Sequence, residues 1–277
     1  MEDKILIFTD LDGTLLSENS YSYYKIIDFY NYISSHCIII FNSSKTYSEI
    51  IELKRLTNDN YPFIVENGSA LYIPENVSLN IPGKITKINN FNVVQLGVPV
   101  NKIINFCSSK KLSKKYVSNC YFLYQMSSSE IVSLTGLNIS EVKKAKKRNY
   151  SLPFIWRGSI ELLNEFKLIC QKNNFKILKG GRFFHLIGET DKGKALRALL
   201  SIYKQCHKNT RFTTIALGDS QNDKDMLIEA DFAGIVKSES KSLMNFRRSK
   251  NVFISEKISP EGWKEVLVKM PPIKNLL

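Results

Sequence analysis

The stretch KILIFTDLDGT at residues 4–14 joins an apolar run directly to two carboxylates. Residues 5–8 are all apolar, which is typical of a strand in the interior of a sheet. Asp10 and Asp12 follow, separated by one residue, and Gly13 permits a tight turn after them. Because burying a carboxylate without a partner is costly, two acids at the end of a buried strand indicate a functional site.

Strand-like and helix-like segments alternate through much of the chain. Apolar runs and helical spacing predict strands at 4–9, 37–41, 212–219 and 232–236, and helices at 21–35, 42–56, 191–204 and 221–230. Residues 61–73 predict two further strands joined by an Asn-Gly turn. Strands that alternate with helices predict an α/β fold with a Rossmann-like core, in which helical crossovers connect the strands of a parallel sheet.

A central segment interrupts this alternation. Pro, Asn and Gly cluster at residues 74–84, and the residues that follow mix strand-like and helix-like patterns. Residues 176–188 hold two short apolar runs around Gly180-Gly181, which predict a hairpin. We therefore expect an inserted α+β cap domain with an antiparallel sheet at residues 84–188, and a core formed by residues 1–83 and 189–277.

The composition is that of a globular protein. The 277 residues are 43% hydrophobic and 23% charged, and no apolar run approaches the roughly 20 residues that span a bilayer. Residues 1–3 are acidic rather than basic at the start, so we expect a cytoplasmic protein with no membrane partner. The five cysteines form no Cys-x-x-Cys pair, so neither a disulfide framework nor a zinc site is expected.

The formal net charge of +13 is compatible with anionic ligands or with nucleic acid. The lysines are spread along the whole chain, however. The densest basic runs, residues 108–115 and 141–148, lack the interleaved aromatic side chains that stack on bases. We interpret these runs as solvated helix faces, so nucleic acid is not expected as a partner, and the oligomeric state is left open.

Several polar residues follow expected strands at the same edge of the sheet. Asp10, Ser43 and Asp219 each come at the end of a strand, and the carboxyl ends of parallel strands form the crevice in which ligands bind. Lys192 and Lys194 open the helix that precedes the strand of Asp219. Carboxylates such as Asp10, Asp219 and Asp223 are suited to Mg²⁺, and a Lys with a hydroxyl completes a site for a phosphoryl group.

The two acids of the first strand suit two different tasks. A carboxylate can attack phosphorus and carry it as an aspartyl phosphate, and we assign this task to Asp10. The period of an extended strand points Asp10 and Asp12 to the same side. Asp12 is therefore placed to protonate the leaving oxygen and later to take a proton from water.

Four motifs in this order resemble the haloacid dehalogenase superfamily of Mg²⁺-dependent phosphatases. They are DLDGT at 10–14, the Ser at the end of the second strand, a Lys, and GDSQND at 218–223. Finer matches are similar to the mannosyl-3-phosphoglycerate phosphatase family, namely FNSSKT at 41–46, ENGSALY at 66–72, SLTGLN at 133–138, FIWR at 154–157, GGRFFHL at 180–186, DKGKA at 191–195 and SPEGW at 259–263. The resemblance implies hydrolysis of mannosyl-3-phosphoglycerate, or of its glucosyl counterpart, to phosphate and a compatible solute.

The resemblance also implies roles for individual residues. Asp10 would be nucleophile and metal ligand, Asp12 the acid and base with its main-chain carbonyl on Mg²⁺, and Asp219 a further ligand. Asp223 would join or support this metal site. Ser43 would bind the phosphoryl oxygens with a lysine, for which Lys192 ranks before Lys194. The remaining residues expected at the substrate are Thr14, Ser44, Lys45, Glu66, Asn67, Arg182, His185 and Asn222.

Other interpretations of these residues are open. Ser44 could cap a helix, residues 66–68 could be a plain turn, and Arg182 and His185 could face water. Within the superfamily, another sugar-phosphate phosphatase or a phosphosugar mutase is the alternative function. A receiver-type signalling domain is disfavoured because both acids follow the first strand, and a nucleic-acid-binding protein with an inert fold is disfavoured by the complete acidic set.

Overall fold

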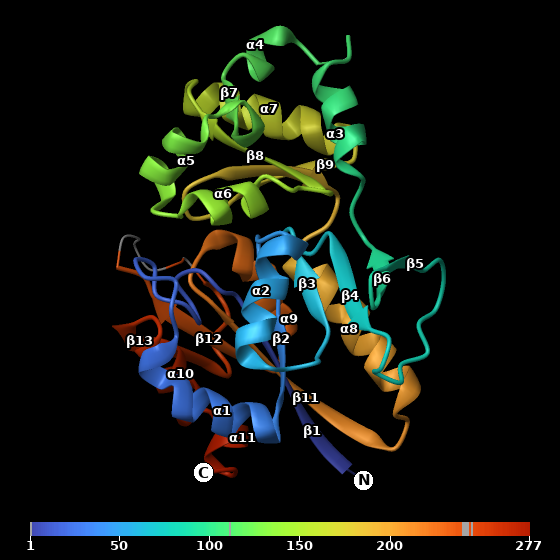
Figure 1. Cartoon of the computed structure of the whole chain (residues 1–277), viewed down its shortest axis with the longest axis vertical. Coiled ribbons are helices and arrows are strands. Elements are labelled where there is room, and N and C mark those ends of the chain that lie inside the picture. The colour runs from blue at the N-terminus through green and yellow to red at the C-terminus, as the bar shows by residue number, and fades with distance from the viewer. Residues whose placement is uncertain (1, 111, 240–243, 245) are drawn as a thin grey trace.

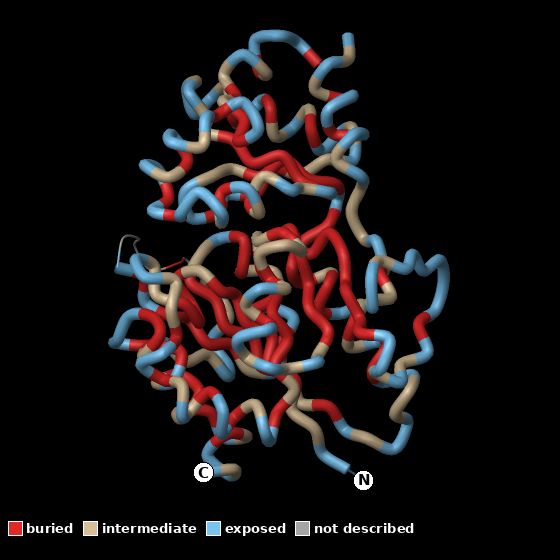
Figure 2. Tube along the Cα trace, in the orientation of Figure 1, coloured by how far each residue is buried: buried red, intermediate tan, exposed pale blue. Residues whose placement is uncertain are grey.

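The computed structural model describes residues 2–110, 112–239, 244 and 246–277. Figure 1 shows two units stacked on each other, with both termini in the lower one. We call the lower unit the core and the upper unit the cap. Each has its own buried interior, which Figure 2 shows in red. Within the described residues, no helix is both long and apolar enough to cross a membrane.

The core is built on the parallel sheet that the alternating pattern predicts. Its strand order is β13-β12-β11-β1-β2. The bounds are β1 (Glu2–Thr9), β2 (Ile38–Phe41), β11 (Thr210–Gly218), β12 (Phe232–Lys237) and β13 (Val252–Ile258). Strand β1 lies between β11 and β2, with Phe8 opposite Ala216 of β11 and Ile40 of β2. This position places the end of β1 directly beside the ends of β11 and β2 at the carboxyl edge.

Helices cover both faces of this sheet. They are η1 (Tyr24–Ile26), α1 (Ile27–His36), α2 (Tyr47–Thr57), α8 (Lys192–Cys206), η3 (Gln221–Asp223), α9 (Lys224–Glu229), α10 (Glu261–Lys269) and α11 (Pro271–Lys274). Successive side chains of a strand point to opposite faces. Accordingly Ile7 packs in the cluster that holds Trp263, whereas Leu6 and Phe8 pack in the cluster that holds Leu199.

The first core helix begins later than the sequence predicted. The expected span was 21–35, but the regular turns begin at Tyr24. Tyr21 has a φ of 50°, which an L-residue rarely adopts and which no helix contains. The apolar residues of this segment therefore do not all lie on one helix face. Ile26, Tyr30 and Ile33 are buried in the core, whereas Tyr21 lies in the loop before the helix.

The cap has the expected antiparallel sheet, of order β7-β8-β10-β9. Its elements are α3 (Val100–Cys107), α4 (Lys114–Val117), β7 (Cys120–Phe122), η2 (Leu123–Gln125), α5 (Ser128–Thr135), α6 (Ile139–Ala145), β8 (Ser151–Trp156), α7 (Ile160–Lys172), β9 (Phe175–Lys179) and β10 (Phe184–Gly188). The hairpin predicted at 176–188 is confirmed by the pairing of β9 with β10.

A further sheet extends the core beyond the expected boundary. Its order is β3-β4-β6-β5, with bounds β3 (Phe63–Val65), β4 (Ala70–Pro74), β5 (Thr86–Ile88) and β6 (Phe91–Gln95). The β3–β4 hairpin confirms the prediction at 61–73. Residues 84–97 were assigned to the cap, but β6 pairs with β4. We therefore propose that the cap begins near residue 98. The sequence did not indicate this boundary, because pairing between strands that are distant in the chain leaves no local signal.

Candidate active site

The carboxyl edge of the core sheet gathers the acids that the sequence placed there. Asp10 follows β1, Asp219 follows β11, and Asp223 ends the η3 turn. All three side chains are buried, and one carboxylate oxygen from each lies within 4.8 Å of the others. We call Asp10, Asp12, Lys192, Asp219 and Asp223 the core rim.

Lys192 balances part of this negative charge. It opens α8 and is completely buried, with its Nζ 2.5 Å from Oδ1 of Asp10 and 2.6 Å from Oδ1 of Asp223. Lys194, the second candidate, donates instead to the carbonyl of Glu189 at the surface. The structure therefore brings Lys192 to the rim and leaves Lys194 outside it.

The electrostatics of the rim favour a bound cation. Burial raises the pKa of Asp10 to about 7, with Lys192 opposing this rise and Asp223 and Asp219 adding to it. Among the described residues, the two buried carboxylates of Asp10 and Asp223 share the one ammonium group of Lys192, so this trio carries a net negative charge. Hard carboxylate oxygens that converge in this way suit a divalent cation such as Mg²⁺.

Hydrogen bonds fix how the rim acids are oriented. Oδ2 of Asp223 accepts from the main-chain N–H groups of Asp219 at 3.1 Å and Ser220 at 2.9 Å. The Thr14 hydroxyl donates to Oδ1 of Asp219 at 3.3 Å. Thr14 was expected at the substrate, but this contact gives it a supporting position beside Asp219.

Asp12 lies next to Lys45, which belongs to the loop between β2 and α2. Nζ of Lys45 is 2.9 Å from Oδ2 of Asp12 and 3.7 Å from Glu49. Burial favours the neutral amine, but Asp12 and Glu49 outweigh it and raise the pKa of Lys45, which stays charged. Oδ1 of Asp12 is buried without a partner among the described residues, so this oxygen is available to a ligand.

The serines after β2 take different positions. The Ser43 hydroxyl is buried and accepts from the main-chain N–H of Lys45 at 3.2 Å. Ser44 lines the cavity above the rim. The helix cap belongs to Thr46, which forms a capping box with Glu49 at the start of α2, so the alternative of Ser44 as the cap is wrong.

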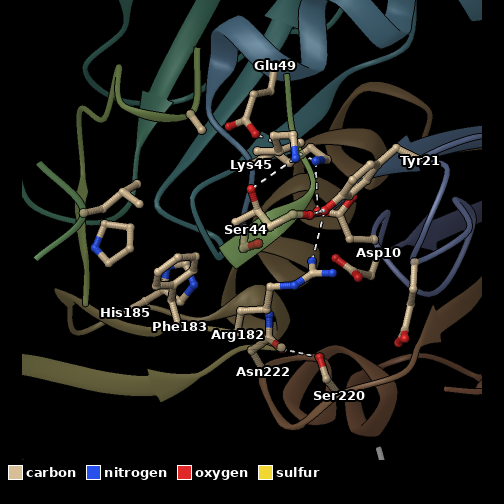
Figure 3. Close-up of a pocket in the computed structure, with 18 of the residues that line it drawn as sticks. Asp10, Tyr21, Ser44, Lys45, Glu49, Arg182, Phe183, His185, Ser220 and Asn222 are labelled. Atoms are coloured by element: carbon tan, nitrogen blue, oxygen red, sulfur yellow. Dashed lines mark hydrogen bonds and ion pairs between the residues drawn. The ribbon is translucent and has the colours of Figure 1, made fainter. Parts of the chain in front are cut away.

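A cavity of about 620 Å³ lies between the rim and the cap. This volume is in the range of sites for small molecules. Its apolar lining comes from the cap and comprises Leu123, Ile131, Leu137, Ala145, Pro153 and Phe183. In Figure 3, Asp10, Tyr21, Lys45 and Arg182 point into the same space.

The hairpin residues Arg182 and His185 both line this cavity. Arg182 forms no ion pair with a carboxylate in the described part of the chain, and its Nη1 donates to the hydroxyl of Tyr21. His185 is buried, and burial with the nearby Arg148 and Lys192 lowers its pKa to about 3. Its Nδ1 is buried and has no partner among the described residues. His185 is thus enclosed at the site, whereas Arg182 lines the cavity with a side chain that is also exposed to solvent.

Glu66 does not lie at the cavity. Its carboxylate accepts from the main-chain N–H groups of Asn149 at 2.9 Å and Tyr150 at 3.1 Å, and from the Ser151 hydroxyl at 2.6 Å. These contacts occupy the carboxylate and join the core to the start of β8. Substrate binding by Glu66 therefore has no support in its contacts.

The turn after Glu66 packs the core tightly. Asn67 accepts from Nδ2 of Asn222 at 2.9 Å, which ties this turn to the GDSQND loop. A Cβ on Gly68, whose φ is 88°, would lie 2.2 Å from the carbonyl oxygen of Asp191. The turn therefore has a structural reason for its Gly, and Asn222 lines the cavity while Asn67 supports it.

Tyr21 and Arg148 are among the cavity residues that the sequence analysis missed. Tyr21 was assigned to a helix. Arg148 belongs to the basic run 141–148 that was interpreted as solvated, yet its side chain is 11% exposed and Nη1 donates to the carbonyl of Ser44 at 2.7 Å. Neither residue belongs to a motif with known spacing, and each reaches the site through contacts between core and cap.

Comparison with known proteins agrees with this geometry. The family model of haloacid dehalogenase-like hydrolases matches residues 7–247. A glucosyl-3-phosphoglycerate/mannosyl-3-phosphoglycerate phosphatase from Persephonella marina is 32% identical over 264 residues, covering 94% of this chain and 95% of its own. A mannosyl-3-phosphoglycerate phosphatase from Pyrococcus furiosus is 36% identical over 234 residues, covering 83% and 90%.

Solved structures agree in fold. A haloacid dehalogenase-like hydrolase from B. subtilis is similar with a TM-score of 0.62 at 16% identity, covering 98% of this chain and 99% of its own. The sucrose-phosphatase from Synechocystis sp. gives 0.58 at 11% identity, covering 97% and 98%. The chain belongs to the haloacid dehalogenase-like hydrolases and, within them, to the mannosyl-3-phosphoglycerate phosphatase family.

Proposed function

We propose that the protein hydrolyses mannosyl-3-phosphoglycerate or glucosyl-3-phosphoglycerate to phosphate and the corresponding glycosylglycerate, with Mg²⁺ as cofactor. It is a phosphoric monoester hydrolase, as its family and its named relatives are. The observation that carries the proposal is the buried Lys192 between Asp10 and Asp223, with Asp10 itself lining a cavity large enough for a phosphorylated sugar-glycerate.

The rim residues divide the reaction into two displacements. An oxygen of Asp10 attacks the phosphorus, and the bond from phosphorus to the glycerate oxygen breaks. Asp12 gives its proton to that oxygen, which leaves as a neutral alcohol. Asp12 then takes a proton from a water molecule that attacks the phosphorus, and the bond to Asp10 breaks to release phosphate.

Three groups support these steps. Asp10, Asp219 and the main-chain carbonyl of Asp12 would hold Mg²⁺, with Asp223 beside them, and the ion supplies neutralisation of the phosphoryl charge. Lys192 is placed to neutralise a phosphoryl oxygen near Asp10. Ser43 is the proposed hydroxyl donor to the phosphoryl group.

The cap supplies the surface for the rest of the substrate. The guanidinium of Arg182, which has no carboxylate partner in the described part of the chain, suits the glycerate carboxylate. The neutral His185 suits a sugar hydroxyl, because its Nδ1 has no hydrogen-bond partner among the residues that the structure describes. The apolar side chains of Leu123 and Phe183 suit the C–H face of a sugar ring.

The test is phosphate release in the presence of Mg²⁺ from four substrates, namely mannosyl-3-phosphoglycerate, glucosyl-3-phosphoglycerate, sucrose phosphate and mannose phosphate. We expect the first two to have the highest kcat/KM. Asp10→Asn should be inactive, whereas Asp28→Asn, which changes an exposed acid on α1, should match the wild type. Equal kcat/KM on mannose phosphate would contradict the substrate assignment and favour a general sugar-phosphate phosphatase.

A further inference from the structure

Tyr21 connects the core to two separate segments of the cap. It lies in the loop between β1 and η1, close in sequence to Asp10 and Asp12. Its hydroxyl donates to the carbonyl oxygen of Thr135 at 2.6 Å and accepts from Nη1 of Arg182 at 3.0 Å. One side chain thus joins the catalytic strand to the end of α5 and to the β9–β10 turn.

The ring of Tyr21 also has contacts with both the cap and the core. It packs against a hydrophobic cluster of the cap that includes Leu123, Ile131 and Val142. Nζ of Lys45 lies 5.2 Å from the ring centroid on the core side. The left-handed φ of 50° costs energy, which these contacts offset.

Arg182 differs from the other cations at the cavity. Lys45 is paired with Asp12 and Glu49, and Arg148 donates to main-chain carbonyls. Arg182 bonds to a neutral hydroxyl, so in the described residues its charge has no carboxylate partner. Figure 3 shows its guanidinium directed toward the hydroxyl of Tyr21.

We propose that Tyr21 is a positioning residue that holds Arg182 where it recognises a carboxylate on the phosphate ester. The inference rests on the proposed function, which supplies the glycerate carboxylate. Tyr21 holds one N–H of the guanidinium and leaves the remaining N–H groups for a planar, two-oxygen contact with a carboxylate in the cavity that Arg182 lines. Tyr21 thereby makes the site selective for phosphate esters that carry a second acidic group.

The experiment compares two inhibitors that differ in the carboxylate. Hydrolysis of p-nitrophenyl phosphate is measured with 3-phosphoglycerate or glycerol 3-phosphate as competitor. We expect the wild type to bind 3-phosphoglycerate about tenfold more tightly, the effect of one charge-assisted hydrogen-bonded contact. Tyr21→Phe should reduce this preference to near unity.

Two further variants separate positioning from structure. Tyr24→Phe removes a hydroxyl from a side chain that is 76% exposed and should keep the tenfold preference. Arg182→Gln should lose the preference, and adding Tyr21→Phe to it should change the inhibition constants no further. A preference that survives Tyr21→Phe, or independent losses in the double variant, would overturn the proposal.

The proposed function and this inference fail in different ways. Poor hydrolysis of glucosyl- and mannosyl-3-phosphoglycerate by the wild type would count against the function. A wild type that hydrolyses these esters well but binds both competitors equally would count against the role of Tyr21 and Arg182.

Discussion

The core rim and the cap side of the cavity hold their polar groups in opposite ways. At the rim, Lys192 is fully buried and bonds to Asp10 and Asp223. On the cap side, Arg182 has no carboxylate partner within the described residues and Nδ1 of His185 is unpaired there. The rim is thus preorganised for one reaction, because ion pairs and hydrogen bonds already hold its groups in place. The cap leaves its bonding capacity to the substrate, which suits a surface that selects the molecule to be hydrolysed.

The largest expected effect breaks the rim by removing its cation. Treatment with a chelator should reduce phosphate release to background, because the converging carboxylates of Asp10, Asp219 and Asp223 then lack the cation that would neutralise the phosphoryl charge. Adding Mg²⁺ should restore activity. It should also raise the Tm of the wild type but not that of Asp219→Ala, since binding to the folded state stabilises it. A Tm that does not respond to Mg²⁺ would contradict a metal site at the rim.

Lys192→Met should lower kcat by about a thousandfold, because the charge next to Asp10 is lost. It should also reduce the free energy of unfolding by about 3–5 kcal/mol, since two buried carboxylates lose their partner. Lys194→Met is the matched control from the same helix. Its Nζ contacts Glu189 at the surface, so we expect near-normal kcat and stability. The reverse outcome for the two variants would show that the wrong lysine has been assigned.

Glu66→Gln tests the hydrogen bonds that connect the core to the start of β8 in the cap. In the wild type the Glu66 carboxylate accepts three hydrogen bonds. The amide of Gln would place an N–H₂ group against some of these donors, so we expect the free energy of unfolding to decrease by about 1–3 kcal/mol. Chemical denaturation measures it, with Glu75→Gln at the surface as the control. If Glu66 bound substrate instead, KM would rise and stability would be unchanged.

The smallest effect sharpens the description of the cap. The folded pKa of His185, about 3, lies below the unfolded value of about 6.5. The unfolded chain therefore binds a proton first as pH falls. His185 should then cost stability below pH 6.5, by about 1.4 kcal/mol per pH unit down to pH 3. Denaturation of the wild type and His185→Gln between pH 7 and 5 gives this slope by difference, with the exposed His36→Gln as the control. Parallel curves would show that His185 is not desolvated.

Local pattern was sufficient to predict the rim. Apolar runs end at Asp10 and Asp219, and parallel strands bring their carboxyl ends together, so the sequence places these acids at one edge. The choice between Lys192 and Lys194 was also within reach. Positions two apart on a helix point about 200° away from each other, so one of them must face away from the sheet.

The cap side was less predictable because it depends on contacts between distant segments. Tyr21 reaches the site through a left-handed backbone and two bonds to the cap, neither of which has a spacing signal. Arg148 was interpreted as a solvated basic residue, but its guanidinium donates to the main-chain carbonyls of Ser44 and Ala145. The pairing of β6 with β4 moved the proposed cap boundary for the same reason.

The most direct test of the account is to trap the covalent intermediate on Asp10. Asp12→Asn should be mixed with p-nitrophenyl phosphate and Mg²⁺, because this leaving group departs without protonation while the missing base slows the second step. Acid quenching, digestion and mass spectrometry then locate the phosphoryl group. We predict that it is found on the peptide of residues 4–14, at Asp10. A variant that turns over with no phosphoryl group on Asp10, or with one on Asp219, would contradict the account.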